Sequence, residues 1–167
     1  MYFYRKYGSM NIIDTYKAAF LSYLENKIIV KEPINLYTPI QYILEIGGKR
    51  LRPVLTILTC DLYDGNHQEA YDAALAIELF HNFTLIHDDI MDSAPIRRGK
   101  VTVHEKWDIN TGILSGDAMM ILASQCFENY KPKQFKKLLK LFNKTALEVC
   151  EGQQLDIDFE TRNNVSI

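Results

Sequence analysis

Three aspartates lie close together at positions 88, 89 and 92, within the segment His-Asp-Asp-Ile-Met-Asp. On a helix, residues four apart share a face, so Asp88 and Asp92 can point at one site, while Asp89 is rotated by about 100°. Two carboxylates on one face repel each other unless a cation lies between them. Oxygen ligands suit Mg²⁺, completed by substrate phosphates, better than zinc. The alternative is a solvated acidic helix end, which would oppose the helix dipole, so we interpret Asp88 and Asp92 as magnesium ligands.

Basic residues form two clusters on either side of the aspartates, namely Lys49, Arg50 and Arg52, and Arg97, Arg98 and Lys100. Arg97 and Arg98 follow Pro95, where a polyanion held by magnesium on one side could meet guanidinium groups on the other. The segment 47–53 places the first cluster where a loop meets a helix start, which favours an anion. The formal net charge of −2 argues against a nucleic-acid partner. Solvated loop charge is the alternative, but two basic clusters around a metal site predict two anionic substrates or one long one.

Polar side chains also interrupt two apolar helical segments. His81 lies seven residues before Asp88, two helical turns away and on nearly the same face. A satisfied core histidine is the alternative interpretation, but this alignment favours a ligand contact. Gln153 and Asp156 share a face in a later segment and indicate a polar cleft.

Apolar periodicity predicts the elements that position these residues, and it is helical almost throughout. We expect helices at about 11–30, 37–46, 53–64, 68–92, 111–130 and 133–160, and no pattern of alternation indicates a strand. The segment 73–86 is apolar on nearly all sides, so its helix should be buried in a bundle and carry the aspartates at its end. The prediction is an all-α fold, with residues 1–10 as an extension and 11–167 as part of a single domain.

Cysteines and apolar runs bear on the compartment. Cys60, Cys126 and Cys150 are far apart, lack metal-ligand spacing and predict reduced core thiols in a cytoplasmic protein. No apolar run is long enough to span a membrane, and residues 1–10 lack the apolar segment of a signal peptide.

Four motifs, in this order, resemble those of the trans-prenyl diphosphate synthases, the polyprenyl synthetase family. They are Gly-Gly-Lys-Arg-Leu-Arg-Pro at 47–53, the aspartates at 88–92, Arg-Arg-Gly at 97–99, and Gly-Gln-Gln-Leu-Asp at 152–156. The resemblance covers the chain from about residue 37 onward. It implies an isoprenoid-synthase-type bundle of long, mostly antiparallel helices, a homodimer, and no integral membrane association. It also implies a Mg²⁺-dependent enzyme that condenses isopentenyl diphosphate with a C5–C15 allylic diphosphate through an allylic carbocation.

The same resemblance implies residue roles. Asp88 and Asp92 would hold magnesium bound to the allylic diphosphate, which Arg97 would also bind. The residues implied for the diphosphate of isopentenyl diphosphate are Lys49, Arg52, His81 and Arg98. Gln153 and Asp156 would line the allylic side of the cleft, with Asp156 close to the metals.

Product length is implied by residues just before the aspartates. In the family, bulk at this position limits the tunnel that receives the growing chain. Phe83 and Thr84 lie five and four positions before Asp88, and Phe80 lies one turn below Phe83. The pattern is similar to enzymes that make C15–C20 products, although an ordinary core phenylalanine is an equal interpretation of Phe80.

The chain departs from the family in one respect. Family members carry a second aspartate-rich motif and a further lysine in later helices, and neither occurs here. We therefore expect the N-terminal half of a synthase, with weak or no condensation activity alone. A noncatalytic helical subunit that binds diphosphates without turnover is the alternative.

Two other classes share single features with this sequence. A ferritin-like di-iron bundle would use a Glu-x-x-His element, which occurs once, as Glu78 and His81, where such sites need two. Class I terpene cyclases share the aspartate motif and the fold, but they do not need Lys49, Arg52 and His81 for a second diphosphate. These three residues favour chain elongation over cyclisation.

Overall fold

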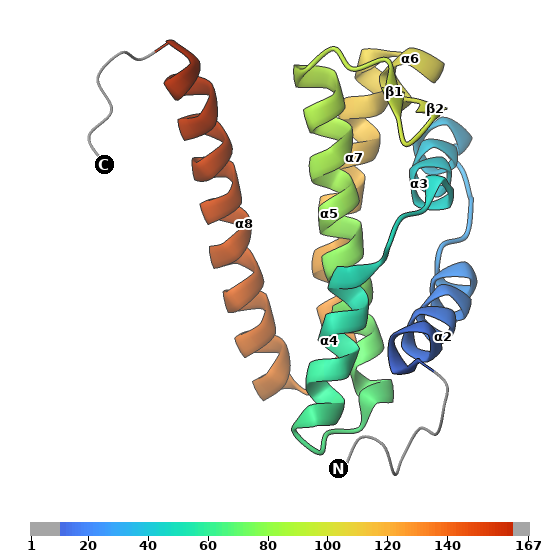
Figure 1. Ribbon diagram of the computed structural model, residues 1–167, viewed down its shortest axis with the longest axis vertical. Coiled ribbons are helices and arrows are strands. Elements are labelled where there is room, and N and C mark those ends of the chain that lie inside the picture. Colours follow the sequence, from blue (N-terminus) through green and yellow to red (C-terminus); the bar gives the residue numbers. More distant parts are fainter. Residues whose placement is uncertain (1–10, 162–167) are drawn as a thin grey trace. The chain divides into compact units, whose positions relative to one another are not determined.

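The computed structural model describes residues 11–161, so the predicted extension at 1–10 lies outside the described part (Figure 1). The chain divides into two compact units after Cys126. The first unit contains α2 (Ile12–Lys27), α3 (Ile34–Ile46), α4 (Leu51–Leu62), the 3-10 turn η1 (His67–Ala70), α5 (Tyr71–Met91), α6 (Val103–Lys106) and α7 (Ile109–Gln125). The turn η2 (Cys126–Asn129) and α8 (Pro132–Thr161) follow. The fold is all-α, as predicted, and each predicted helix is present.

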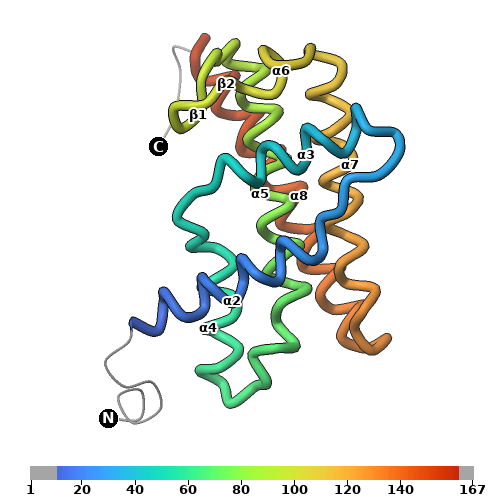
Figure 2. Tube along the Cα trace, turned by 90° about the vertical axis from the view of Figure 1, so that its right-hand side faces the viewer, coloured from blue at the N-terminus to red at the C-terminus, as the bar shows by residue number. Residues whose placement is uncertain are grey.

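Helix α5 is the centre of the first unit, and it contacts α2, α3, α4, α6 and α7. Figures 1 and 2 show α4 and α7 running antiparallel to it on different sides. Its side chains Leu79 and Ile86 are fully buried, together with Phe20 of α2, Ile57 of α4 and Met119 of α7. Burial of each such side chain stabilises the fold by roughly 1.5–3 kcal/mol. This core fixes the position of α5, and therefore also the position of the aspartates at its C-terminal end.

Helix α3 begins three residues earlier than predicted, directly after Pro33, and contains Pro39. Proline lacks the amide hydrogen of an i→i−4 bond and is therefore best tolerated in the first turn of a helix. A start at residue 37 would have placed Pro39 in that turn. Helix α4 likewise begins at Leu51, before Pro53, because Arg50 caps it in the left-handed conformation (φ 54°, ψ 32°).

A β-hairpin follows α5, and the prediction of no strand is wrong at this point. Strands β1 (Ile96–Arg97) and β2 (Lys100–Val101) pair antiparallel, with Arg97 opposite Lys100. Two-residue strands are too short to produce a pattern of alternation. The turn residues Arg98 (φ 52°) and Gly99 (φ 77°) both have positive φ, as a type I′ turn requires.

The second unit consists mainly of α8, in which the ring of Phe142 packs on that of Phe127 with centroids 5.3 Å apart. All three cysteines are free thiols. The prediction of core thiols is wrong for Cys150, which is exposed. Within residues 11–161, no helix combines the length and the apolar character that a membrane span needs.

Candidate functional site

The predicted metal ligands lie in the last turn of α5. Asp88 is half-buried, and Asp92 is the exposed C-cap, whose amide donates to the Asp88 carbonyl oxygen at 2.8 Å. Burial raises the pKa of Asp88 above its ordinary value; the negative charge of Asp92 adds to this, and Arg97 partly opposes it. The two carboxylates therefore repel each other, and a bound cation would relieve this repulsion.

Asp89 faces away from this pair, as its helical position predicts, and it is buried (2% exposed). Arg97 of β1 binds it through Nε, which is 2.9 Å from both carboxylate oxygens, and through Nη2, 2.7 Å from Oδ1. This bidentate ion pair fixes the hairpin to the end of α5. Arg97 was predicted to bind the allylic diphosphate, and the structure shows that two of its nitrogens already hold Asp89.

The hairpin is also tied to α3, because the Tyr42 hydroxyl donates to the Val101 carbonyl oxygen at 2.7 Å. At its tip, Arg98 approaches the loop before α4. A Cβ built on Gly48 (φ 153°) would lie 2.5 Å from Arg98 Nη1, so a side chain there would displace this guanidinium group and would also strain the backbone at its positive φ. The left-handed conformation of Arg98 costs about 1–2 kcal/mol, and the hairpin holds it there.

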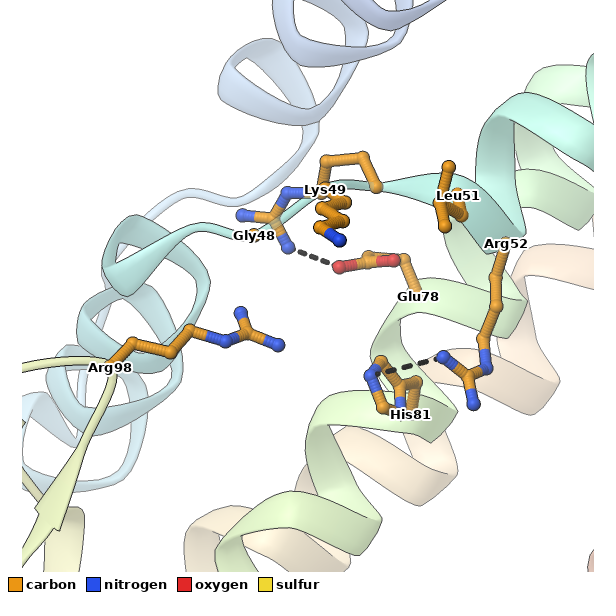
Figure 3. A pocket seen from close by; sticks show the side chains of 8 residues that line it. Gly48, Lys49, Leu51, Arg52, Glu78, His81 and Arg98 are labelled. Atoms are coloured by element: carbon orange, nitrogen blue, oxygen red, sulfur yellow. Dashed lines mark hydrogen bonds and ion pairs between the residues drawn. The ribbon is translucent and has the colours of Figure 1, made fainter.

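Residues from four elements meet around a cavity of about 500 Å³. Figure 3 shows Lys49 from the loop, Arg52 from α4, His81 from α5 and Arg98 from the hairpin turn around this cavity, which Gly48, Arg50, Leu51 and Glu78 also line. The structure thus brings together the four residues predicted for one diphosphate. We call this cavity the basic pocket.

His81 is the uncharged member of the basic pocket. Burial, and then the positive charge of Arg52, lower the pKa of His81. The imidazole is therefore neutral at pH 7, and its Nε2 accepts a weak bond from Arg52 Nη1 at 3.4 Å. Lys49, Arg52 and Arg98 are exposed and supply the positive charge. Three cations beside a single carboxylate, that of Glu78, which Arg50 already holds, suit a di- or trivalent anion.

A buried ion pair lies beside the basic pocket and was missed by the sequence interpretation. Arg50 Nη1 donates to Glu78 Oε1, and Nη2 donates to the carbonyl oxygen of Leu44 at the end of α3. Glu78 also accepts from Asn82 Nδ2 at 3.1 Å. The one available signal was a glutamate inside an apolar helix, which requires a buried cationic partner.

The engagement of Glu78 also bears on the di-iron alternative. Its carboxylate is committed to Arg50, and the described residues 11–161 contain no group of three His, Cys, Asp or Glu side chains able to hold a metal. Two carboxylates without a third protein donor suit a cation that completes its shell with water and substrate oxygens, as Mg²⁺ does. Asp88 and Asp92 would be the residues that hold it.

The residues predicted for chain length lie on a half-buried face of α5. The Phe83 ring packs edge-on against His87, with centroids 4.7 Å apart, and against Phe80 at 5.7 Å. The Thr84 hydroxyl donates to the carbonyl oxygen of His81 within the helix (2.8 Å). Phe80 is half-buried and therefore is not a fully buried core residue.

Gln153 and Asp156 lie in α8, in the second unit. Gln153 is half-buried and Asp156 is exposed. Their neighbour Gln154 instead bonds along the helix, donating to Asp158 Oδ1 at 2.8 Å. A position of Gln153 and Asp156 beside the aspartates stays a prediction.

Comparison with known proteins gives consistent matches. The family described as polyprenyl synthetase matches residues 33–167. A geranylgeranyl diphosphate synthase of Methanosarcina mazei is 43% identical over 145 residues, covering 86% of this chain and 45% of the relative. A short chain isoprenyl diphosphate synthase of Methanocaldococcus jannaschii is 43% identical over 137 residues, covering 81% and 42%. A crystal structure of a geranylgeranyl pyrophosphate synthase superimposes with a TM-score of 0.92 at 56% identity, covering 95% of this chain and 48% of that one. The chain spans less than half the length of these proteins.

Proposed function

This chain belongs to the polyprenyl synthetase family, and we propose that it carries the diphosphate-binding part of a short-chain prenyltransferase. The observation that carries the proposal is the basic pocket. Its residue His81 lies on α5 about two turns before Asp88, so the pocket is separate from the Asp88–Asp92 pair at the end of the same helix. Two separate anion sites suit two diphosphate substrates, isopentenyl diphosphate and an allylic diphosphate. A cyclase, which takes one diphosphate, has no use for the basic pocket.

In the proposed reaction, Lys49, Arg52 and Arg98 bind the diphosphate of isopentenyl diphosphate, and neutral His81 donates or accepts one hydrogen bond there. Arg97 and the Asp88–Asp92 pair face the allylic diphosphate. Mg²⁺, when bound, supplies charge neutralisation on the departing diphosphate. The allylic C–O bond breaks with its electrons going to the diphosphate, and the isopentenyl double bond attacks the allylic carbon. A proton then leaves to the released diphosphate. Asp156 and Gln153 would complete the allylic side.

The substrate assignment is tested by calorimetry with isopentenyl diphosphate in the presence of a metal chelator. Arg98→Gln is expected to weaken binding by about 10- to 100-fold, because a charge-assisted hydrogen bond contributes roughly 1.5–3 kcal/mol. Lys100→Gln is the matched control, since Lys100 is exposed on the same hairpin but does not line the basic pocket. Equal losses for the two variants, or no binding by the wild type, would contradict the assignment.

A second candidate is a noncatalytic subunit that binds diphosphates without turnover. It rests on the same observation, because the basic pocket can bind a diphosphate whether or not turnover follows. Incorporation of radioactive isopentenyl diphosphate into an acid-labile product, with geranyl diphosphate and Mg²⁺, separates the two candidates. Sustained turnover supports the enzyme, and tight binding without incorporation supports the subunit.

The product is proposed to be a C15–C20 prenyl diphosphate, limited by Phe83 and Thr84. Phe83→Ala is expected to shift the product to longer chains, because removal of the ring deepens the space beside α5. Phe80→Ala, one turn below, is the comparison variant. Thin-layer chromatography of the dephosphorylated products measures the shift, and an unchanged distribution for Phe83→Ala would remove this residue from the role.

The same proposal places the protein in the cytoplasm as a homodimer. Free thiols at all three cysteines support a reducing compartment. Exposed apolar side chains on α7, among them Leu114 (60% exposed) and Ile121 (59%), support association.

A further inference from the structure

Where the loop meets α4, the side chain of Arg50 turns inward while those of its neighbours Lys49 and Leu51 are exposed. Lys49 and Arg52 are exposed at the basic pocket, whereas Arg50 between them is 5% exposed. The left-handed backbone of Arg50 (φ 54°) turns its side chain inward, and its carbonyl oxygen accepts from the Val54 amide at 3.2 Å to start α4. Arg50 is therefore an interior residue, although its basic neighbours Lys49 and Arg52 are exposed.

Inside, Arg50 joins three elements. Its guanidinium group donates to the carbonyl oxygen of Leu44 in α3 and to Glu78 in α5, while its own backbone caps α4. Glu78 is 3% exposed and lies one turn before His81 on α5. The ion pair therefore sets the position of the loop relative to the helix that carries His81.

The position of Glu78 matters because this carboxylate also lines the basic pocket (Figure 3). It is the only acidic residue among those that line it, beside the cations Lys49, Arg52 and Arg98. Neither Lys49 nor Arg98 makes an ion pair with any residue in the range 11–161. Without Arg50, the cations that line the same cavity would be available as ion-pair partners for the Glu78 carboxylate.

We propose that Arg50 is a positioning residue that occupies Glu78 and so keeps the cations of the basic pocket available to an anionic ligand. In this proposal Arg50 acts through Glu78 and not through a bond of its own to the ligand. The inference rests on the proposed function for the identity of the ligand, a diphosphate. It assigns a role to Arg50, which lines the cavity but whose guanidinium group is held by Glu78 and the carbonyl oxygen of Leu44.

The test is a double-mutant cycle on the full chain, with Arg50→Met, Glu78→Gln and Arg50→Met/Glu78→Gln. Binding of isopentenyl diphosphate, and separately of inorganic pyrophosphate, is measured by calorimetry in chelator, at a temperature where circular dichroism shows each variant folded. Arg50→Met is expected to weaken binding at least about tenfold, because the uncovered carboxylate competes for Lys49 or Arg52. The double variant is expected to return to within about threefold of the wild type.

Recovery of binding in the double variant separates this proposal from a general loss of structure. If Arg50→Met merely damaged the fold of the site, a second substitution at Glu78 would not restore binding. A double variant as weak as Arg50→Met would overturn the proposal, and so would an Arg50→Met variant that binds like the wild type. Arg50→Gln, which keeps a donor near the Leu44 carbonyl, replaces Arg50→Met in the cycle if the latter does not fold. Wild-type binding of pyrophosphate but not of isopentenyl diphosphate counts against the proposed function alone, and the cycle is then read with pyrophosphate. Binding of neither anion overturns both.

Discussion

Replacement of Asp88 by asparagine is expected to weaken magnesium-dependent binding of an allylic diphosphate by about 100-fold or more. Loss of a residue that only orients a metal ligand typically costs 10- to 100-fold, so loss of a ligand itself should cost at least as much. Calorimetry with a thiolodiphosphate analogue that does not ionise, at fixed Mg²⁺, measures the effect. Asp64→Asn is the matched control, because Asp64 lies in a turn at positive φ, which asparagine tolerates.

The same substitution should act in the opposite direction on stability when magnesium is removed. The raised pKa of Asp88 means that the folded state binds a proton more tightly than the unfolded state. Stability therefore falls as pH rises from the ordinary pKa of 3.8 through the raised value, and it does not recover above that range. In chelator, Asp88→Asn should lack this loss and melt at a higher temperature than the wild type at pH 7. A lower melting temperature together with unchanged analogue binding would show that Asp88 has only a structural role.

The helices were predictable because their apolar side chains repeat every three to four residues, and α5 is the clearest case. The faces of the aspartates were predictable for the same reason, since Asp89 must turn inward when Asp88 and Asp92 turn outward. The partner of Asp89 was not predictable. Arg97 reaches it only because the chain reverses after α5 and pairs two very short strands, and this contact is decided by tertiary structure.

His81 shows the limit of arguments from helical faces. Its spacing from Asp88 places both residues on nearly the same face, but seven residues also separate them by about 10 Å along the axis. The structure accordingly groups His81 with Arg52 and Arg98 in the basic pocket. A shared face on a long helix can thus serve two neighbouring sites.

Arg50 shows a different limit. In the sequence it is one of the three basic residues in the segment 49–52. Its residue type alone does not show that it is buried while Lys49 and Arg52 are exposed. Its left-handed backbone and its contact with Glu78 make the difference, and both depend on how α3 and α5 meet the loop.

Replacement of Arg97 by methionine should lower the free energy of unfolding by about 3 kcal/mol, because it leaves the buried Asp89 carboxylate without a partner. Asp89→Asn should cost less, since Arg97 is 24% exposed and its guanidinium group can turn to water. The double variant Arg97→Met/Asp89→Asn should be more stable than Arg97→Met alone. Urea unfolding followed by circular dichroism measures all three.

Arg98→Met is the matched control for Arg97→Met, because the two arginines are adjacent on one hairpin but have different surroundings. Arg98 faces the basic pocket and makes no ion pair within the described range 11–161, so its loss should change stability by less than about 0.5 kcal/mol. Its loss should instead weaken the binding of isopentenyl diphosphate. Equal stability of the two variants would show that the Asp89–Arg97 pair does not hold the hairpin. The expected result is a large loss of stability for Arg97→Met and a loss of binding for Arg98→Met. Arg97 would then hold the structure of the site, and Arg98 would bind the substrate.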